Sequence, residues 1–308
     1  MDLFKLVKDF KNGKAKDNSI NSYVICVRKL HEDKDFYDLD LLEDKEFIMS
    51  KINAMEYLTT RKNYLNAVCV CLEADGRDNK FYLQMKRDVV NEYNSFLDKN
   101  IMTTKQKNNW LKVKDLHQVS KNLLRDIKKR GLYNKNKDEI NADERSVIQD
   151  YLISLLYTEI NPIRLDYAPM KIVYSLEHLH QETNYLYIKN KSNKTFIINN
   201  YKNVKSRGSQ QIKVPKKVND VINRWLKINP TENFLISLGG NALTENALGK
   251  YISRIFTIYG RTASLNIIRH IIVSESIDIE KTKEQKELAD NMSHSTATQL
   301  SYAKHLDK

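Results

Sequence analysis

The sequence contains few residues that interrupt regular structure and few that could cross-link a fold. Its 308 residues include 8 glycines, 4 prolines and 3 cysteines. So few glycines and prolines favour long helices over a loop-rich fold. The odd number of cysteines and the lack of a CxxC pair argue against a disulfide framework. Cys69 and Cys71 lie in an apolar periodic segment, where free cysteines are typical core residues.

Long hydrophobic runs are also missing. No stretch of about 18 apolar residues occurs, and residues 1–14 lack the apolar stretch and small-residue cleavage site of a signal peptide. The sequence has no clustered set of Asp and Glu, no His/Cys spacing typical of metal sites and no nucleotide-binding loop. We therefore expect no membrane-spanning segment, no secretion, no metal and no other cofactor.

Positive charge is what the sequence has in excess. Lys and Arg number 51 and Asp and Glu 39, which leaves a formal net charge of +12 at pH 7. Such a chain attracts polyanions by electrostatic steering and by release of their counterions, so DNA, RNA and anionic membranes all fit as partners. With 41% hydrophobic residues over this length, the chain can bury one or two cores.

The first hundred residues carry apolar side chains at helical spacing. Four segments show this pattern, and four such helices can form a compact bundle: residues 20–30, 47–55, 59–72 and 89–97. The polar stretch 98–109 loses the periodicity and is predicted to be the interdomain linker. The expected domains are residues 1–102 and 103–308.

The second part of the chain mixes helical and strand-like patterns. Residues 114–129 predict a helix, and Asn141 begins another with the capping-box sequence NADE. Between Met170 and Val214, four β-rich runs separated by polar turns predict a small antiparallel sheet, and helical periodicity returns after Trp225. The expected fold class is mainly α with a small antiparallel β-sheet (α+β).

Three segments of this second part resemble motifs of a known family. They are IRLDYAP at 163–169, IIRH at 267–270 and MSHSTATQLSY at 292–302. Their identity and order resemble the tyrosine recombinase and phage integrase family, and the resemblance extends over nearly the whole chain. It implies a helical, SAM-like core-binding domain that binds DNA at the N-terminus, and a tyrosine recombinase catalytic domain after it.

The resemblance also implies a set of catalytic residues. The family has an arginine after the second catalytic-domain helix, a lysine on a β-hairpin, HxxRH on a helix, then GHS and a tyrosine. By position these are Arg164, Arg269, His294 and Tyr302. For the hairpin lysine, the segment NNYKNVKSRG offers Lys202 at the end of a strand and Lys205 in the turn, and Lys202 is preferred.

Two departures from the family pattern bear on the mechanism. The first His of HxxR is Asn266 here, and His294 precedes Tyr302 by eight residues where about nine is usual for the family. An asparagine donates and accepts hydrogen bonds but does not titrate. Asn266 is therefore expected to hold the phosphate without acting as an acid or a base, which predicts slower chemistry.

These residue types suit phosphoryl transfer independently of the resemblance. Attack by a phenol oxygen on a phosphodiester builds negative charge on the nonbridging oxygens, which cationic donors stabilise. Arginine bonds two phosphate oxygens at once and stays charged. The phenol has an unperturbed pKa near 10 and needs a proton acceptor or a positive field, while the leaving 5′ oxygen needs a proton donor, for which Lys202 is the candidate.

Double-stranded DNA is the partner that this chemistry requires. Predicted DNA contacts come from the start of a helix, from the basic linker and from the hairpin turn, although solvated lysines are the commoner reading of such segments: Arg61, Lys62, Lys105, Lys107 and Lys205. Family behaviour implies a homotetramer assembled on two DNA sites. The abundance of Asn, Lys and Ile suggests AT-rich coding DNA and therefore an integrase of a virus or mobile element. Such a protein is expected wherever its target DNA lies: the cytoplasm, a viral factory or the host nucleus.

Other readings stay open. Taken alone, Tyr302 is one of 17 tyrosines, and a tyrosine in a terminal amphipathic helix is usually a packing residue. A type IB topoisomerase uses similar chemistry to relax supercoils. A catalytically lapsed DNA-binding protein of the same fold is suggested by Asn266 and by the shortened spacing before Tyr302. Neither the target sequence nor the direction of reaction can be read from one chain.

Overall fold

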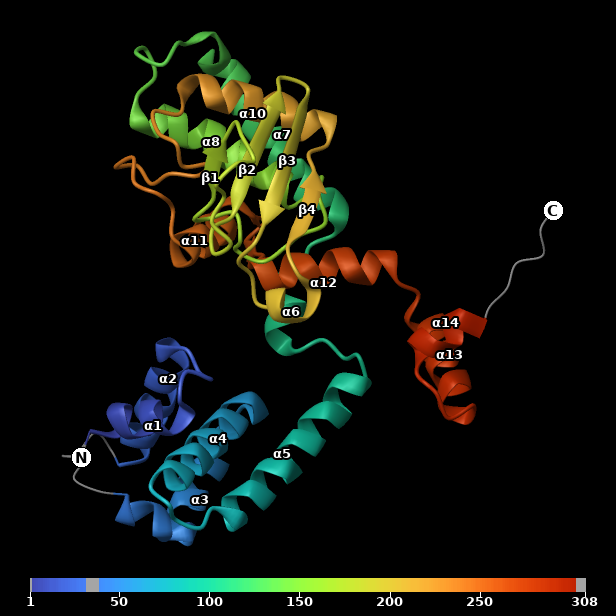
Figure 1. Cartoon of the computed structure of the whole chain (residues 1–308). Coiled ribbons are helices and arrows are strands. Elements are labelled where there is room, and N and C mark those ends of the chain that lie inside the picture. The colour runs from blue at the N-terminus through green and yellow to red at the C-terminus, as the bar shows by residue number, and fades with distance from the viewer. Residues whose placement is uncertain (1, 32–38, 303–308) are drawn as a thin grey trace. The chain divides into compact units, whose positions relative to one another are not determined.

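The computed structural model describes residues 2–31 and 39–302, with side chains described up to Gln299 (Figure 1). The chain divides into two compact units, Met1–Met102 and Thr103–Lys308. Each unit has its own hydrophobic core.

The first unit is helical in its described part. Helix α4 lies at its centre and packs against its neighbours α1, α2, α3 and α5. Its second half is buried without interruption from Ala67 to Leu72, and burial raises the pKa of the Cys71 thiol to about 12. The elements are α1 (Leu3–Lys11), α2 (Asp17–Leu30), the 3-10 helix η1 (Asp40–Glu43), α3 (Lys45–Asn53), α4 (Leu58–Ala74) and α5 (Lys80–Asp98).

Helix α1 was not among the helices that the sequence pattern predicted. Its apolar residues Leu3, Leu6, Val7 and Phe10 have helical spacing, but the pattern spans only nine residues, and only Leu3 and Val7 are buried. It begins where the Asp2 carboxylate accepts a hydrogen bond from the Lys5 amide at 3.0 Å. The four predicted helices correspond to α2, α3, α4 and α5.

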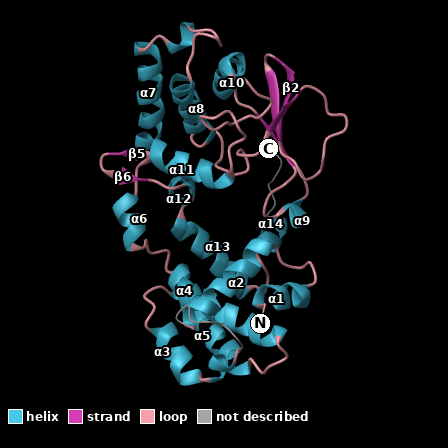
Figure 2. Ribbon diagram, turned by 90° about the vertical axis from the view of Figure 1, so that its left-hand side faces the viewer, coloured by secondary structure: helices cyan, strands magenta, loops and turns pink. Residues whose placement is uncertain are grey.

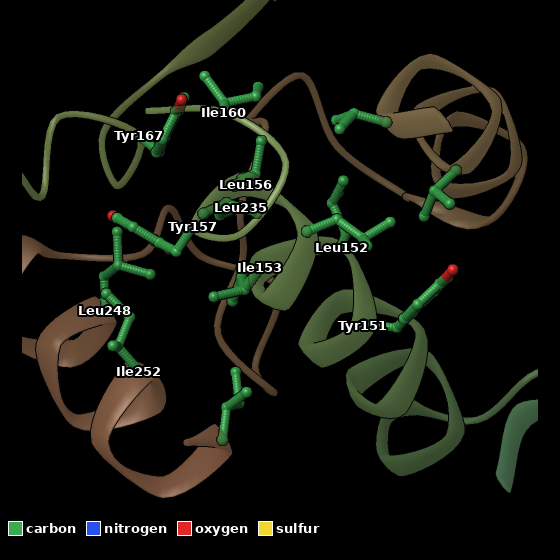
Figure 3. Packing of buried hydrophobic residues seen from close by; sticks show 14 of the residues in the cluster. Tyr151, Leu152, Ile153, Leu156, Tyr157, Ile160, Tyr167, Leu235, Leu248 and Ile252 are labelled. Carbon is green, nitrogen blue, oxygen red and sulfur yellow. The ribbon is translucent and has the colours of Figure 1, made fainter. Parts of the chain in front are cut away.

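The second unit is built around helix α8 (Ala142–Leu156). Its residues from Ile148 to Leu156 are all buried, and α7 (Val113–Lys129), α10 (Lys216–Ile228) and α11 (Glu245–Ile255) pack against it. Figure 3 shows side chains of α8 meeting Leu248 and Ile252 of α11. The predicted capping box is present, since the Glu144 amide donates to Asn141 Oδ1 at 2.9 Å. A 3-10 helix, η2 (Leu132–Asn134), connects α7 to α8.

A four-stranded sheet lies beside these helices, with α7 and α8 to one side of it (Figure 2). Its strands follow chain order: β1 (Lys171–Val173), β2 (Tyr185–Asn190), β3 (Asn193–Ile198) and β4 (Gln210–Lys213). The β2–β3 and β3–β4 pairs are antiparallel, as predicted. The β1–β2 pair is parallel, so the sheet is mixed where the sequence predicted an antiparallel one. The predicted fold class, mainly α with a small sheet, is confirmed. The loop 174–184 returns the chain to the end at which β1 began.

The predicted linker also contains regular structure. Thr103 and Gln106 form a capping box that begins α6 (Thr104–Asn109). A two-stranded hairpin, β5 (Thr257–Ile258) with β6 (Arg261–Thr262), holds this helix: the Thr262 amide donates to Asn109 Oδ1 at 3.0 Å, and the Arg261 guanidinium donates to the Trp110 carbonyl at 2.8 Å. Residues 104–109 therefore belong to the second unit.

The described part of the unit ends in three helices: α12 (Leu265–Ser276), α13 (Ile279–Asn291) and α14 (Thr296–Tyr302). Helix α12 packs against α7 and α11, and α13 contacts α14. Every residue of α13 is exposed except Ala289. This helix therefore contributes little to the core of the unit.

Candidate active site

Arg164 lies in the loop that joins α8 to β1. The Tyr157 hydroxyl donates a hydrogen bond to the Arg164 carbonyl at 2.8 Å. Burial raises the pKa of Tyr157 well above its ordinary value, so the hydroxyl remains a donor. The Arg164 side chain is half-buried, and in the described part of the chain no hydrogen bond or ion pair occupies its guanidinium.

Asp166 is the acidic residue nearest to Arg164 in the sequence. Burial raises the pKa of its carboxyl, the charge of Glu245 raises it further, and the charge of Arg164 lowers it. No ion pair within 4.0 Å joins Arg164 to Asp166 among the described side chains. Arg164 is therefore not neutralised by this neighbour.

Lys202 lies in the connection between β3 and β4, residues 199–209. Two hydrogen bonds close the neck of this loop: the Ser209 hydroxyl donates to Asn199 Oδ1 at 2.6 Å, and the Tyr201 hydroxyl donates to the Gly208 carbonyl at 2.9 Å. Lys202 precedes the short helix α9 (Val204–Arg207), which contains Lys205, and both lysines are exposed. The loop holds Lys202 at its base and Lys205 farther along it.

The loops of Arg164 and Lys202 lie at the same end of the sheet. The first leads into β1, and the second follows the end of β3, which pairs antiparallel with β2 while β2 runs parallel to β1. The carboxyl end of β3 therefore adjoins the amino ends of β1 and β2. In Figure 2, α9, which belongs to the Lys202 loop, lies near the lower end of the sheet.

Asn184, just before β2, connects these two loops. Its Nδ2 donates to the carbonyls of Asp166 and Asn200, both at 3.0 Å. Its Oδ1 accepts from the amides of Asn199 at 2.9 Å and Asn200 at 2.8 Å. The sequence does not identify Asn184, because an asparagine before a strand has no local pattern that distinguishes it from a turn residue.

Arg269 and Asn266 lie on α12, three residues apart and hence on neighbouring positions of one side of the helix. Leu265, Ile268 and other apolar residues of α12 are buried in the core that Ile163 and Leu165, the neighbours of Arg164, also contact. Arg269 is half-buried and Asn266 exposed. As for Arg164, no hydrogen bond or ion pair with a described residue occupies the Arg269 guanidinium.

His294 and Tyr302 come from the last two helices. His294 is half-buried between α13 and α14, its amide donates to the Ala289 carbonyl at 3.0 Å, and its Nδ1 lies 3.2 Å from the Ser295 carbonyl oxygen. Tyr302 is the last residue of α14, and its side chain lies outside the described residues. The structure brings the loops of Arg164 and Lys202 together and leaves the predicted position of the Tyr302 phenol untested.

The predicted DNA-contact residues have different surroundings. The Arg61 guanidinium donates to the carbonyls of Asn53 at 2.9 Å and Met55 at 2.7 Å, so it caps the end of α3. Lys62 Nζ lies 4.5 Å from the centre of the Tyr93 ring. Lys105 and Lys107 of α6 are exposed. Contact of any of them with DNA stays a prediction.

The described residues contain neither a metal-binding cluster nor a membrane-spanning helix. No group of three or more His, Cys, Asp or Glu side chains is arranged to hold a metal ion. Within the same residues, no helix has both the length and the apolar character needed to cross a bilayer.

Comparison with known proteins gave a structural match. No protein-family model matches the sequence, and no curated protein matches it. The crystal structure of XerA recombinase matches over 99% of this chain and 94% of its own, with a TM-score of 0.33 and 11% sequence identity. At such a TM-score the match carries no conclusion about chemistry, which must come from the residues of this chain.

Proposed function

We propose that this protein is a site-specific DNA recombinase or integrase that cuts and rejoins duplex DNA through a 3′-phosphotyrosyl bond to Tyr302. The observation that carries the proposal is the pair Arg164 and Arg269. Both are half-buried, and neither guanidinium has a hydrogen-bond or ion-pair partner among the described residues. Partly buried cations without a partner in the protein favour an external anion, and a phosphodiester fits the arginine fork.

The reaction follows from the residue types. The Tyr302 phenol gives its proton to solvent water as its oxygen attacks phosphorus, an O–P bond forms, and the bond from phosphorus to the 5′ oxygen breaks. Arg164 and Arg269 stabilise the charge that develops on the nonbridging oxygens. Lys202 gives a proton to the leaving 5′ oxygen, and His294 assists at the phosphate. Attack by a free 5′ hydroxyl on the phosphotyrosine reverses the step and rejoins strands without ATP.

Recombination breaks four strands, so it requires four active sites. We therefore propose that four copies assemble on two DNA sites, with the N-terminal unit binding DNA. The positive net charge supports a duplex partner. A type IB topoisomerase would act as a monomer, so the number of protein copies on the cleaved DNA distinguishes the two enzymes.

Asn266 favours a second candidate, a DNA-binding protein that has lost strand cleavage. A neutral amide in place of an imidazole removes one group that could transfer protons. This candidate predicts tight DNA binding without any covalent product.

The test is to trap the covalent intermediate. The full-length protein is incubated with a pool of duplexes that have a randomised centre and a nick beside it, so that a short 5′-hydroxyl fragment diffuses away after cleavage. We expect a denaturation-resistant protein–DNA adduct that Tyr302→Phe abolishes. Retention of the adduct in Tyr302→Phe would reject Tyr302 as the nucleophile, and binding without an adduct would support the lapsed protein.

A further inference from the structure

We propose that Asn184 is a positioning residue that holds the loops of Arg164 and Lys202 in one fixed arrangement. The inference rests on the proposed function, because it assigns these two loops to one reaction. Asn184 is only 1% exposed. Sequence motifs do not identify it, and the order of residues along the chain does not connect it to either loop.

The side-chain amide of Asn184 makes all the hydrogen bonds that it can make. A primary amide has two N–H donors and an oxygen with two lone pairs, and all four make hydrogen bonds of 2.8–3.0 Å here. One donor binds the carbonyl of Asp166, two residues after Arg164. The other three bonds go to Asn199 and Asn200, which stand immediately before the Tyr201–Lys202 turn. One planar group thus sets the distance between the two loops.

The other hydrogen bonds of these loops do not replace this connection. Asn199 Nδ2 donates to the Thr183 carbonyl at 3.0 Å, and Asn200 Nδ2 donates to the Glu182 carbonyl at 3.1 Å. These bonds tie the Lys202 loop to residues before β2, not to the Arg164 loop. Among the hydrogen bonds of the described residues, Asn184 supplies the one side chain that reaches both loops.

Placement to within an ångström matters for this reaction. Arg164 must reach a nonbridging oxygen while Lys202 reaches the 5′ oxygen of the same phosphate. A displacement of about 1 Å in a catalytic group can reduce a rate about 100-fold. Asn184→Ala leaves two amides and two carbonyls without their partner, so the loops are expected to rearrange to satisfy these groups.

Asn219 provides a matched control at the opposite end of β3. It is also buried, at 4% exposed, and it also binds through both ends of its amide, accepting from Lys194 Nζ at 2.7 Å and donating to the Lys191 carbonyl at 3.0 Å. Its contacts lie at the β2–β3 turn, away from the Lys202 loop. Loss of a buried asparagine in general would affect Asn184→Ala and Asn219→Ala alike.

The experiment measures single-turnover cleavage of a duplex recovered from the trapped pool, in two forms. One form has the ordinary 5′ oxygen at the scissile phosphate, and the other has sulfur at that bridging position. A thiolate leaves without protonation, so the sulfur substrate does not need the proton from Lys202. The ratio of the two rates therefore reports the placement of Lys202, which a general loss of stability does not change.

We expect Asn184→Ala to slow cleavage of the ordinary duplex ~10- to 100-fold. The sulfur duplex should be slowed much less, so the rate ratio should shift in the same direction as in Lys202→Ala. Asn219→Ala should leave the ratio at the wild-type value. The milder Asn184→Ser, which keeps one donor and one acceptor, should fall between Asn184→Ala and wild type, and it serves if Asn184→Ala fails to fold.

The outcomes separate this inference from the proposed function. If the wild type cleaves both duplexes but Asn184→Ala and Asn184→Ser keep the wild-type rate ratio, the positioning role is wrong and the proposed function stands. If the wild type forms no adduct with any duplex, the proposed function fails and the positioning role fails with it.

Discussion

The surroundings of Arg164 and Arg269 distinguish these two residues from the other arginines of the chain as candidates for binding a phosphate. Arg164 lies between Ile163 and Leu165, and Arg269 lies on α12. The apolar residues of both segments pack in the same core, which fixes the backbone near each guanidinium. The sequence could identify both, because they stand in short motifs. It could not identify Asn184 or Tyr157, because their roles depend on hydrogen bonds to residues that only the folded chain brings within 3.0 Å.

Two buried tyrosines beside Arg164 form a natural pair of test sites. The Tyr157 hydroxyl holds the Arg164 carbonyl, whereas the Tyr167 hydroxyl is buried and has no hydrogen-bond partner among the described residues. We expect Tyr157→Phe to slow strand cleavage ~3- to 10-fold, because one hydrogen bond of about 1 kcal/mol is lost. Tyr167→Phe should leave cleavage unchanged and stability equal or higher. Single-turnover rates and thermal melting check both, and equal rates in the two variants would contradict the role of Tyr157.

Asn266 allows a gain-of-activity test. An imidazole at this position could transfer protons, which general acid–base groups exploit for about 10²-fold or more. We expect Asn266→His to accelerate strand cleavage at least ~10-fold and to add a titration near the ordinary pKa of histidine, about 6.5, to the pH–rate profile. Asn266→Gln, which keeps an amide, is the control. An unchanged rate and pH profile in Asn266→His would show that residue 266 does not face the phosphate.

At the scale of elements, the sequence predicted the long helices well and the short elements poorly. Helices α7 and α8 have clear caps and continuous apolar faces. The parallel pairing of β1 depends on the path of the loop after it, which periodicity does not contain. Helix α6 and the β5–β6 hairpin each have six residues or fewer, and they are stabilised by contacts between segments about 150 residues apart in the chain, at Asn109 and Thr262.

The ion pair of Asp150 on α8 with Arg254 on α11 predicts a pH-dependent stability. The two groups are 2.7 Å apart, with side chains 7% and 56% exposed. Burial raises the pKa of Asp150 above its ordinary value, and Arg254 lowers it in part. A carboxyl with a raised pKa contributes stability below its ordinary pKa, and this contribution is lost as pH rises through the raised pKa.

Removal of Arg254 should enlarge that loss. We expect Arg254→Ala to lower the free energy of unfolding at pH 7 by about 1–3 kcal/mol, and to lower it less at pH 4, where Asp150 is closer to neutral. Adding Asp150→Asn to this variant should recover most of the loss at pH 7. Urea unfolding between pH 4 and 8 checks this, and a destabilisation that is independent of pH would contradict it.

At the scale of the whole molecule, the net charge of +12 predicts binding to DNA that weakens with salt. If Lys105 and Lys107 each contact a phosphate, Lys105→Glu with Lys107→Glu should reduce the slope of log affinity against log salt by about 1.8. The control is Lys128→Glu with Lys137→Glu, which makes the same change of charge in the last turn of α7 and in the segment between α7 and α8. Equal slopes for the two double variants would show that α6 does not contact DNA.

The two units also differ in the roles proposed for them. The second unit contains every residue proposed to act on the phosphate, whereas the first has a separate core. DNA binding by the first unit is assigned by family resemblance alone. Arg61, a predicted DNA contact of this unit, uses its guanidinium to bind backbone carbonyls of the same unit. Helix α13, exposed along most of its length, has no sequence pattern that predicts what it contacts.

The central claim is a covalent bond between Tyr302 and the 3′ end of a cleaved DNA strand. The most direct measurement is to digest the trapped protein–DNA complex with a protease and identify, by mass spectrometry, the peptide that carries the nucleotide and the DNA end to which it is joined. We expect a single modified residue, Tyr302, joined to a 3′ phosphate, with a free 5′ hydroxyl on the other strand end. A nucleotide on any other residue, or a 5′ phosphate link, would contradict it.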